Sequence, residues 1–395
     1  MSSLAWIDFD EAERQRARRL MALFAEKESR DELGLGPIRD SIADLLFPGT
    51  STIQTRLRYM LFVPWIYRMV EQQSGTADQL AGRARDLEIG LIDALRAGDE
   101  DEGIIGRDAG PTLKRLPSSI YWAGLRTWGI RTFEGSQEAY FGAIPALRRD
   151  ARNAIRTEDQ AAAHEDSHIA NWRAGLPPAP ANLMKKAGFR LSREEAGFLI
   201  DRLVDSQPTS LLTRLAKTGR HATCSYIWEH PDLATFPAKI GRLVEDARVF
   251  SMLMHGAALL YNLMLAEKRK NDEWIALYRD SLARWLDDLD PGALASWSLP
   301  DFWLRIDHPD HRIREPARSF IHRWLELVRN GAPAVADNTE ARELVRTREM
   351  RLKRAQSRFV NLSMLDRWGG SSGSRPLSFR WAEASSHIGD LVDAR

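Results

Sequence analysis

The run VFSMLMHGAALLYNLMLA, residues 249–266, is the stretch that decides the fold of this chain. If it is fully helical, its length approaches that needed to span a bilayer. It contains Ser251, His255 and Asn262, however, and it is isolated in a chain of otherwise ordinary soluble composition. These polar groups favour a helix buried on most sides in a helical core over a membrane span. His255 is interpreted as a hydrogen-bonded core histidine rather than a general base.

The rest of the chain also has mostly helical apolar spacing, and alternating runs long enough for a sheet are scarce. Amphipathic helices are expected at residues 10–24, 77–97 and 191–204, the last with Ser192 and Glu195 at the spacing of a capping box. The sequence therefore predicts a predominantly α, multi-helical protein.

Residues 104–130 suggest a small module of another kind. A short extended piece is followed by a basic turn with Lys114 and Arg115, and then by a helix at 118–127. This order of elements predicts a winged-helix-like module in the N-terminal half.

Two interruptions rich in proline and glycine divide the chain. AGLPPAPA at residues 174–181 opposes both helix and sheet, and NGAPAVAD at 330–337 interrupts the helices again. Three parts are predicted: an N-terminal helical domain at 1–173, a helical domain at 182–329, and a basic C-terminal helical segment at 338–395.

Overall composition restricts the function only weakly. The 395 residues are 44% hydrophobic, enough for more than one core, and 56 basic residues face 55 acidic ones. The net charge of +1 gives no global argument for nucleic acid, so any basic surface must be local. The single cysteine, Cys224, excludes an internal disulfide framework, and the first residues lack the pattern of a signal peptide. A cytoplasmic location is expected, with no membrane contact and no cofactor.

The best local charge signal lies at residues 342–358, where seven basic residues face two acidic ones, a local net charge of +5. Helical spacing places Leu352, Ala355, Phe359 and Leu362 on one apolar seam. The candidate nucleic-acid-binding residues lie mainly off that seam: Arg346, Arg351, Lys353, Arg354 and Arg358. Such a surface neutralises phosphates with a strong salt dependence. A solvated helix, or a contact for an acidic partner protein, remains the alternative.

A second basic site is suggested by the block GLGPIRDSIADLLFPGTSTIQTRLRYMLFVPWIYRMV at residues 34–70. A helix is expected to begin near Thr52, to bury Ile53 and to kink or restart at Pro64. Arg56 and Arg58 beside a capped helix start can hold a phosphate, together with Lys114 and Arg115.

The alternative for Arg56 and Arg58 is that they are solvated, or paired with Asp40 and Asp44.

The sequence HEDSH matches H-E-x-x-H, so His164 and His168 on one helix face can ligate zinc while Glu165 activates a bound water. A third ligand such as Glu194 or Glu195 has to come from beyond the proline-rich run. A surface helix is the favoured interpretation, because short motifs often match by chance.

Other residues of catalytic type are better explained by structure. The sequence DHPDH at 307–311 is interpreted as a turn, and Cys224 as a small buried residue. GGSSGS at 369–374 lacks the Gly-Lys-Ser/Thr ending of a nucleotide loop and is interpreted as a flexible turn.

Four blocks together resemble a known family: residues 34–70, 104–130, the helix at 250–267, and 342–381 with its RxRExxLKxxxSRFxN pattern and WGGSSG. They are similar to a family of uncharacterised bacterial proteins often encoded among antiphage-defence genes. The resemblance implies a role in bacterial immunity beside a helicase or nuclease partner, and it carries over no catalytic residue.

Three hypotheses follow. The first is a non-enzymatic component of an antiphage-defence complex that contacts DNA or RNA through its basic residues. The second is a scaffold whose basic helix meets an acidic partner protein. The third is a zinc hydrolase that uses His164, Glu165 and His168.

Overall fold

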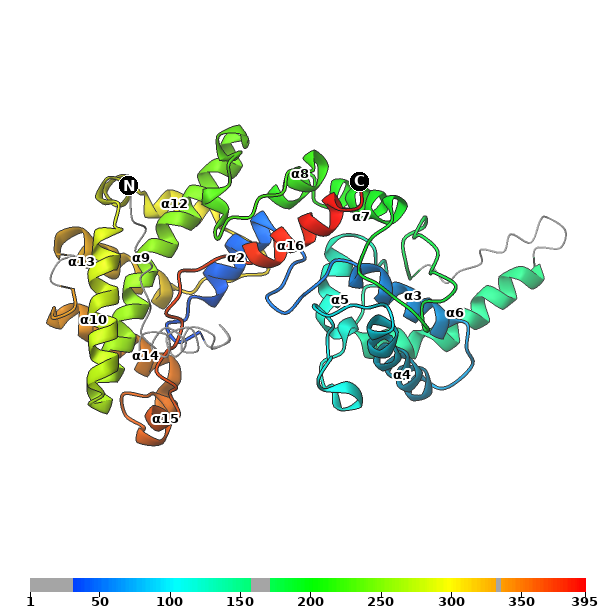
Figure 1. The fold of residues 1–395 in the computed structure, drawn as a ribbon, viewed down its shortest axis with the longest axis horizontal. Coiled ribbons are helices and arrows are strands. Elements are labelled where there is room, and N and C mark those ends of the chain that lie inside the picture. Colours follow the sequence, from blue (N-terminus) through cyan, green and yellow to red (C-terminus); the bar gives the residue numbers. More distant parts are fainter. Residues whose placement is uncertain (1–30, 158–170, 332–334) are drawn as a thin grey trace, which may run out of the picture. The chain divides into compact units, whose positions relative to one another are not determined.

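The computed structural model describes residues 31–157, 171–331 and 335–395 (Figure 1). Within these ranges the regular structure is helical, and the only strand-like pairing is an isolated bridge between Arg131 and Trp172. The chain forms two compact units. Unit 1 comprises residues 1–42 and 237–379, and unit 2 comprises 43–236 and 380–395. The predicted predominantly α fold is confirmed.

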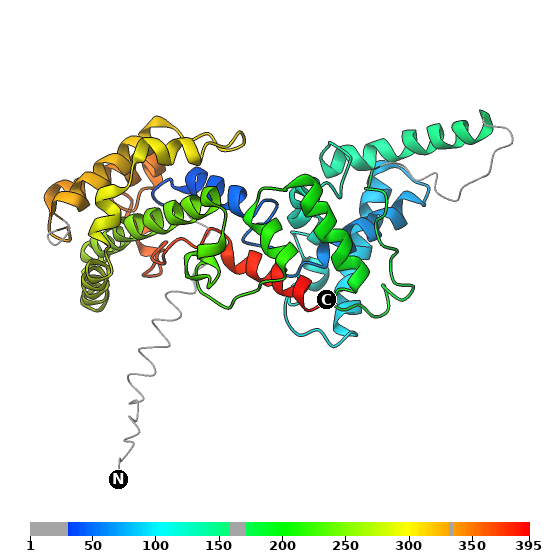
Figure 2. The ribbon, with the colours of Figure 1, turned by 90° about the horizontal axis from the view of Figure 1, so that it is seen from above.

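The core of unit 1 is the long helix α9, Ala238–Arg269, packed against α10, Asp272–Asp287 (Figures 1 and 2). A left-handed residue, Lys270, ends α9, and the Asn271 side chain caps α10, so the two helices turn back on each other. At Gly256 the helices approach so closely that a Cβ atom would collide with the Trp285 ring. One described helix, α9, is long and apolar enough to cross a membrane, but 83% of its apolar stretch is buried inside the protein. The prediction of a core helix is confirmed.

The other helices of unit 1 surround this pair. They are the first part of α2 (Gly36–Leu46), α11 (Pro291–Ser296), α12 (Leu299–Arg305), α13 (Glu315–Gly331), α14 (Thr339–Lys353) and α15 (Leu362–Asp366). Both α13 and α14 pack on α9 and on each other.

The apolar seam predicted for the basic segment is wrong. Helix α14 ends at Lys353, and a single 3-10 turn, Arg354–Gln356, follows it. Residues 355–362 therefore do not continue the helical spacing, and Leu352 and Leu362 are 41% and 65% exposed. The helix docks instead through four buried residues: Ala341, Val345, Arg348 and Glu349.

Unit 2 is a second helical cluster. Its helices are α3 (Tyr59–Glu71), α4 (Ala77–Arg96), α5 (Pro117–Thr127), α6 (Gln137–Thr157), α7 (Arg193–Ser206), α8 (Leu211–Thr218) and α16 (Trp381–Val392), joined by the last residues of α2. The expected helices at 77–97 and 191–204 are confirmed, and each begins with a complete capping box.

Three local predictions in unit 2 are corrected. Residues 52–58 form turns, so the helix expected near Thr52 begins at Tyr59, and Ile53 is 40% exposed. Pro64 lies inside α3, which continues through it. Residues 104–130 contain a 3-10 turn and α5, but within the described residues they contain no strand, so the hairpin of a winged helix is missing.

The two proline-rich interruptions lie inside the units rather than between them. Residues 174–181 belong to unit 2, where the Trp65 indole donates a 2.7 Å hydrogen bond to the Pro177 carbonyl. In the 330–337 run, which belongs to unit 1, Val335 is buried and Asp337 pairs with Arg279. The described residues of both runs therefore pack within a unit, and the boundaries between the two units fall at other positions.

Candidate nucleic-acid interface

Unit 1 contains a groove of about 970 Å³ between the start of α2, the segment before α13 together with its first turns, and the last turns of α14. Six arginines line it: Arg312, Arg314, Arg323, Arg348, Arg351 and Arg354. Only two acidic side chains, Asp31 and Glu315, share the lining. Arginines thus outnumber acidic side chains in this groove, which we call the arginine groove.

Four of these arginines have side chains that are available to a ligand. Arg312, Arg314, Arg351 and Arg354 are exposed, and within the described part of the chain their side chains have no hydrogen bond or ion pair. An arginine without a carboxylate partner keeps its whole planar fork of donors available for a ligand.

The other two arginines of the groove are structural. Arg323 on α13 pairs with Glu340 and Glu326. The Arg348 side chain is buried and donates to the carbonyls of Leu33, at 2.8 Å, and Pro316, at 3.0 Å. Burial lowers the pKa of the Arg348 guanidinium. Arg348 therefore fixes the chain before α2 against the start of α13, and so fixes the groove walls.

Arg354 occupies an unusual backbone conformation. It follows the last residue of α14 with φ +51° and ψ −122°, a region that residues with a Cβ atom rarely adopt. Holding an arginine there costs on the order of 1–3 kcal/mol, and such strain concentrates at functional positions. The residue that ends α14 is thus an arginine rather than a glycine, and its side chain lines the groove together with Arg351.

Three of the five residues predicted on this segment do not line the groove. Arg346 pairs with Glu343 at 3.5 Å and covers the Phe359 ring, and Lys353 pairs with Glu32 at 3.2 Å.

Arg358 is buried. Its guanidinium lies 3.0 Å from Glu32 and donates to Tyr261 Oη at 3.2 Å and Ser372 Oγ at 2.8 Å. A guanidinium committed in this way does not reach a ligand in solution, so the structure leaves only Arg351 and Arg354 of the predicted set in the groove.

The candidate nucleic-acid-binding residues of unit 2 do not line the arginine groove. Arg56 pairs with Asp390 (Nη2 to Oδ1, 2.7 Å) and Arg58 with Glu195 (Nη2 to Oε1, 2.6 Å). Both arginines are therefore paired, although with other carboxylates than Asp40 and Asp44. Lys114 and Arg115 are exposed, and no side-chain partner for them occurs among the described residues.

Sequence reasoning missed Arg312 and Arg314. The turn predicted at 307–311 is present, and its His308 ring accepts a hydrogen bond from the Asp310 amide at 3.2 Å. The alternation Arg-Ile-Arg directly before the α13 start was the available signal.

No metal centre is found among the described residues, where no group of three or more His, Cys, Asp or Glu side chains is placed to hold an ion. His164, Glu165 and His168 lie outside the described residues. The suggested third ligand Glu195 is already engaged by the Ser192 capping box and by Arg58.

Cys224 is half-buried rather than fully buried, and burial raises the pKa of its thiol. This disfavours the thiolate that a nucleophile requires.

The structure thus defines a mostly helical protein of two compact units with an arginine-lined groove in unit 1. The chain belongs to a family of unknown function, DUF6361, whose model matches residues 1–395. No curated protein and no solved structure matches it.

Proposed function

We propose that this protein is a non-enzymatic, nucleic-acid-binding component of a bacterial antiphage-defence system, and that the arginine groove contacts the nucleic acid. One observation carries the proposal: four exposed arginines without carboxylate partners in the described chain converge on one groove. Phosphate neutralisation by such residues releases counterions and supplies most of the affinity of non-specific nucleic-acid binding. The defence setting rests on the family resemblance of the sequence blocks.

The chemistry of the groove favours the sugar–phosphate backbone over the bases. Guanidinium groups match phosphate oxygens in a bidentate geometry. The aromatic residue of the groove lining, Phe320, is 3% exposed, so the described groove offers no platform on which an unpaired base can stack. Binding is therefore expected to tolerate sequence changes and to weaken steeply with salt.

Fluorescence anisotropy with single- and double-stranded DNA and RNA across a salt series tests the proposal. The variant Arg351→Ala/Arg354→Ala removes two groove charges. The matched control, Arg242→Ala/Lys268→Ala, removes two exposed charges on α9 that do not line the groove. We expect the groove variant to bind about 10- to 100-fold more weakly at low salt, with a salt slope smaller by about two. Equal affinity for the groove variant and the control would contradict the proposal.

A second candidate function is a contact with a protein partner, such as a helicase or nuclease encoded nearby. Large apolar side chains are exposed beside the basic end of α14: Met350 at 37%, Val360 at 56% and Leu362 at 65%. Exposed apolar groups next to cations suit an acidic amphipathic segment. Co-purification of a partner that survives nuclease treatment, and that Leu362→Asp abolishes, would favour this function over nucleic-acid binding.

A further inference from the structure

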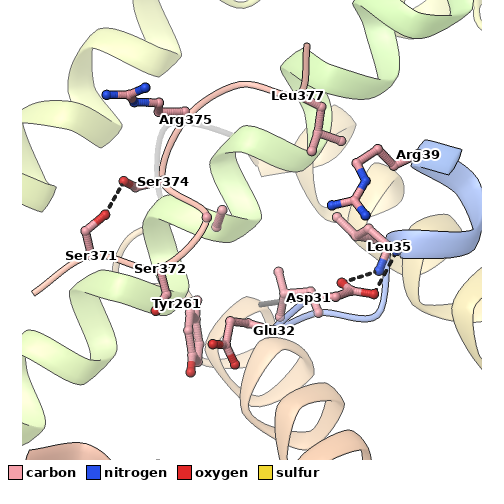
Figure 3. Close-up of a pocket in the computed structure, with 14 residues that line it drawn as sticks. Asp31, Glu32, Leu35, Arg39, Tyr261, Ser371, Ser372, Ser374, Arg375 and Leu377 are labelled. Carbon is pink, nitrogen blue, oxygen red and sulfur yellow. Dashed lines mark hydrogen bonds between the residues drawn. The ribbon is translucent and has the colours of Figure 1, made fainter. Parts of the chain in front are cut away.

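The small cavity of unit 1 beside residues 31–39 leaves little for a ligand to bind (Figure 3). Its volume is about 80 Å³, which is space for a few waters. The Asp31 carboxylate accepts hydrogen bonds from the amides of Leu35, at 2.6 Å, and Gly36, at 2.7 Å. The Ser371 and Ser374 hydroxyls are hydrogen-bonded to each other at 2.7 Å.

Residues 369–374, which supply one wall of this cavity, are held by hydrogen bonds. The Asn262 side chain donates to the Ser372 carbonyl and accepts from its amide, both at 2.9 Å. His255 Nε2 donates to the Ser374 carbonyl at 3.0 Å, as expected of a core histidine. Residues 369–374 therefore form an ordered loop rather than the flexible turn that the sequence predicted.

Unit 2 contains a larger cleft, with a volume of about 440 Å³. It lies between α3, the first three turns of α4 and the starts of α5 and α6, and we call it the α4 cleft. Pockets for small organic ligands have volumes of this size. None of the residues that the sequence predicted to bind nucleic acid lines it.

The α4 cleft exists because one face of α4 carries small side chains. Positions 77, 81, 84 and 88 are separated by four, three and four residues, so they share one face of the helix. The first three are alanines, and the fourth is Glu88. Gly82 also lines the cleft, and a Cβ atom built on it would meet nothing within 4 Å. The missing side-chain volume leaves room for a ligand over α4.

Two aromatic rings add to the apolar lining. Tyr67 of α3 and Phe141 of α6 lie with their ring centroids 5.2 Å apart. Gln137 Nε2 donates to Tyr67 Oη at 3.0 Å and so fixes the phenol. Such rings, together with the alanine methyl groups, accommodate an alkyl chain, and aromatic faces also attract cations.

Glu88 brings an unsatisfied carboxylate oxygen to the cleft. Its side chain is 1% exposed, and its Oε2 atom accepts a hydrogen bond from the Ser118 amide at 2.7 Å. Its Oε1 atom has no hydrogen-bond partner among the described residues. A buried polar atom without a partner is rare, because its desolvation is not compensated. A ligand that donates a hydrogen bond to Oε1 removes this cost.

Negative charge predominates in the lining. Asp78 and Glu138 are exposed, and within the described part of the chain neither has a hydrogen bond or an ion pair. The cation of the lining, Arg85, donates to the carbonyls of Pro111, at 3.0 Å, and Leu113, at 2.9 Å. Three carboxyl groups thus share the cleft with one guanidinium that is already bonded, and a cationic ligand is their complement.

Three helices begin at the cleft, but side chains of the protein already bind amides in their first turns. Thr76 caps α4 in a capping box, and Ser136 Oγ accepts from the Ala139 amide of α6. Glu88 does the same for the Ser118 amide of α5. Helix starts attract anions through such amides, so their occupation leaves the acidic side chains to select the ligand.

We infer that the α4 cleft binds a small linear diamine. One ammonium group donates to Glu88 Oε1, the alkyl chain lies against the alanines of α4 and the two aromatic rings, and the second ammonium group faces Asp78 and Glu138. Each part of this ligand corresponds to one feature: the unpartnered buried oxygen, the apolar lining, and the two exposed carboxylates. The inference goes beyond the arginine groove and does not depend on it.

Diamine binding should be linked to the protonation of Glu88. Burial raises the pKa of its carboxyl to about 7, and an adjacent ammonium group favours the ionised form. Binding below pH 7 should therefore release a proton, and affinity should rise with pH up to about 7. Burial also raises the pKa of both tyrosines that interact with Glu88, so neither exchanges a proton in this range. The ionisable neighbours of Glu88 are Tyr59, Tyr67, Asp78, Arg85 and Glu138.

Isothermal titration calorimetry of the full chain with 1,4-diaminobutane tests the inference. The neutral 1,4-butanediol has the same length, and n-butylamine has a single ammonium group. Glu88→Gln removes the buried charge but keeps the shape, and Gly82→Leu fills the cleft where a side chain meets open space. The matched control is Asp86→Asn, because Asp86 is exposed on α4 outside the lining. Thermal melting shows which variants fold, and Gly82→Leu should melt no lower than the wild type because leucine favours a helix.

We expect 1,4-diaminobutane to bind, n-butylamine to bind about tenfold more weakly, and 1,4-butanediol to show no binding. Glu88→Gln and Gly82→Leu should weaken diamine binding by about tenfold or more, and Asp86→Asn by less than about twofold. Titrations at about pH 6 in buffers of different ionisation enthalpy should show that the wild type releases most of one proton and Glu88→Gln none.

The inference is overturned if the diamine does not bind, or if n-butylamine or the diol binds as tightly. It is also overturned if Gly82→Leu leaves diamine affinity unchanged, or if Asp86→Asn weakens it as much as Glu88→Gln. The ligand comparison and Gly82→Leu keep the test decisive if Glu88→Gln does not fold. The groove is judged separately by the Arg351→Ala/Arg354→Ala variant, so failure of one site is distinguishable from failure of the other.

Discussion

The arginines of unit 2 and those of the arginine groove look alike in sequence and differ in what surrounds them. Arg58 lies between the Glu195 carboxylate and the Gly188 carbonyl, with distances of 2.6 and 2.7 Å. Arg351 and Arg354 face the groove with no carboxylate partner in the described chain. The partner, and not the charge, therefore decides whether an arginine stabilises the fold or is available to a ligand.

The largest effect on stability is expected for Arg58→Ala, which tests whether Arg58 stabilises the fold rather than binding nucleic acid. This change leaves Glu195, whose side chain is 6% exposed, without its counter-charge. Breaking a buried pair in this way costs about 3–5 kcal/mol. Urea denaturation followed by tryptophan fluorescence should show that loss, while nucleic-acid affinity of the folded variant should match that of the wild type. If the variant were as stable as the wild type, the pair between Arg58 and Glu195 would not stabilise the fold.

The pH dependence of stability tests the role of Glu88, a buried acid that has no ion pair among the described residues. Glu88 accepts a 2.7 Å hydrogen bond from the Ser118 amide, and burial raises the pKa of its carboxyl from 4.5 to about 7. Because the folded pKa is the higher one, this contribution to stability is complete below pH 4.5 and is lost as pH rises through 7. The loss is about 3 kcal/mol.

Glu88→Gln should remove that dependence. His387 titrates in the opposite sense, since burial lowers its pKa from 6.5 to about 4 and its contribution is lost as pH falls. The His387 contribution changes between about pH 4 and 6.5 and overlaps the Glu88 range, so Glu88 is isolated by the difference in urea stability between the wild type and Glu88→Gln, measured from about pH 4.5 to 8. Relative to Glu88→Gln, the wild type should lose about 3 kcal/mol of stability as pH rises from 4.5 to 7, and parallel curves for the two proteins would refute the assignment.

Arg312→Ala/Arg314→Ala tests the half of the groove that comes from the segment before α13. If both guanidinium groups contact phosphates, affinity should fall by about 1–2 kcal/mol at low salt, and the salt slope should drop by about two. Thermal stability should be unchanged, because neither side chain has a partner in the described chain. Anisotropy titrations at several salt concentrations measure both quantities, and an unchanged slope would restrict the contact to the α14 side.

The smallest effect on stability is expected for Arg354→Gly, which separates a loss of nucleic-acid binding from a loss of stability. Arg354→Gly removes a groove charge and also relieves the φ +51° conformation. A glycine in this region should raise the free energy of unfolding by about 1 kcal/mol. The variant should therefore melt at a higher temperature and bind nucleic acid more weakly. Tighter or equal binding together with higher stability would exclude Arg354 from the interface.

Much of the fold was predictable because local signals determine it. The apolar run inside α9 and the capping boxes before α4 and α7 lie in continuous sequence, and each predicts its own helix. The end of α14 was not predictable, since Arg354 ends the helix without a glycine or proline.

The candidate site was less predictable because it depends on distant partners. Glu195 lies 137 positions from Arg58, and Glu32 lies far in sequence from Lys353 and Arg358. No spacing rule relates such positions, so the sequence predicted Arg58, Lys353 and Arg358 as nucleic-acid-binding candidates in the same way as Arg351. The fold separates them.

Hydrogen–deuterium exchange of the protein with and without its tightest-binding oligonucleotide tests the proposal that the arginine groove binds nucleic acid. We expect slower amide exchange in residues 312–323 and 344–354, which bear the arginine groove, and unchanged exchange at 56–58 and 114–115 in unit 2. Protection confined to 114–115, with none at the groove, would contradict it.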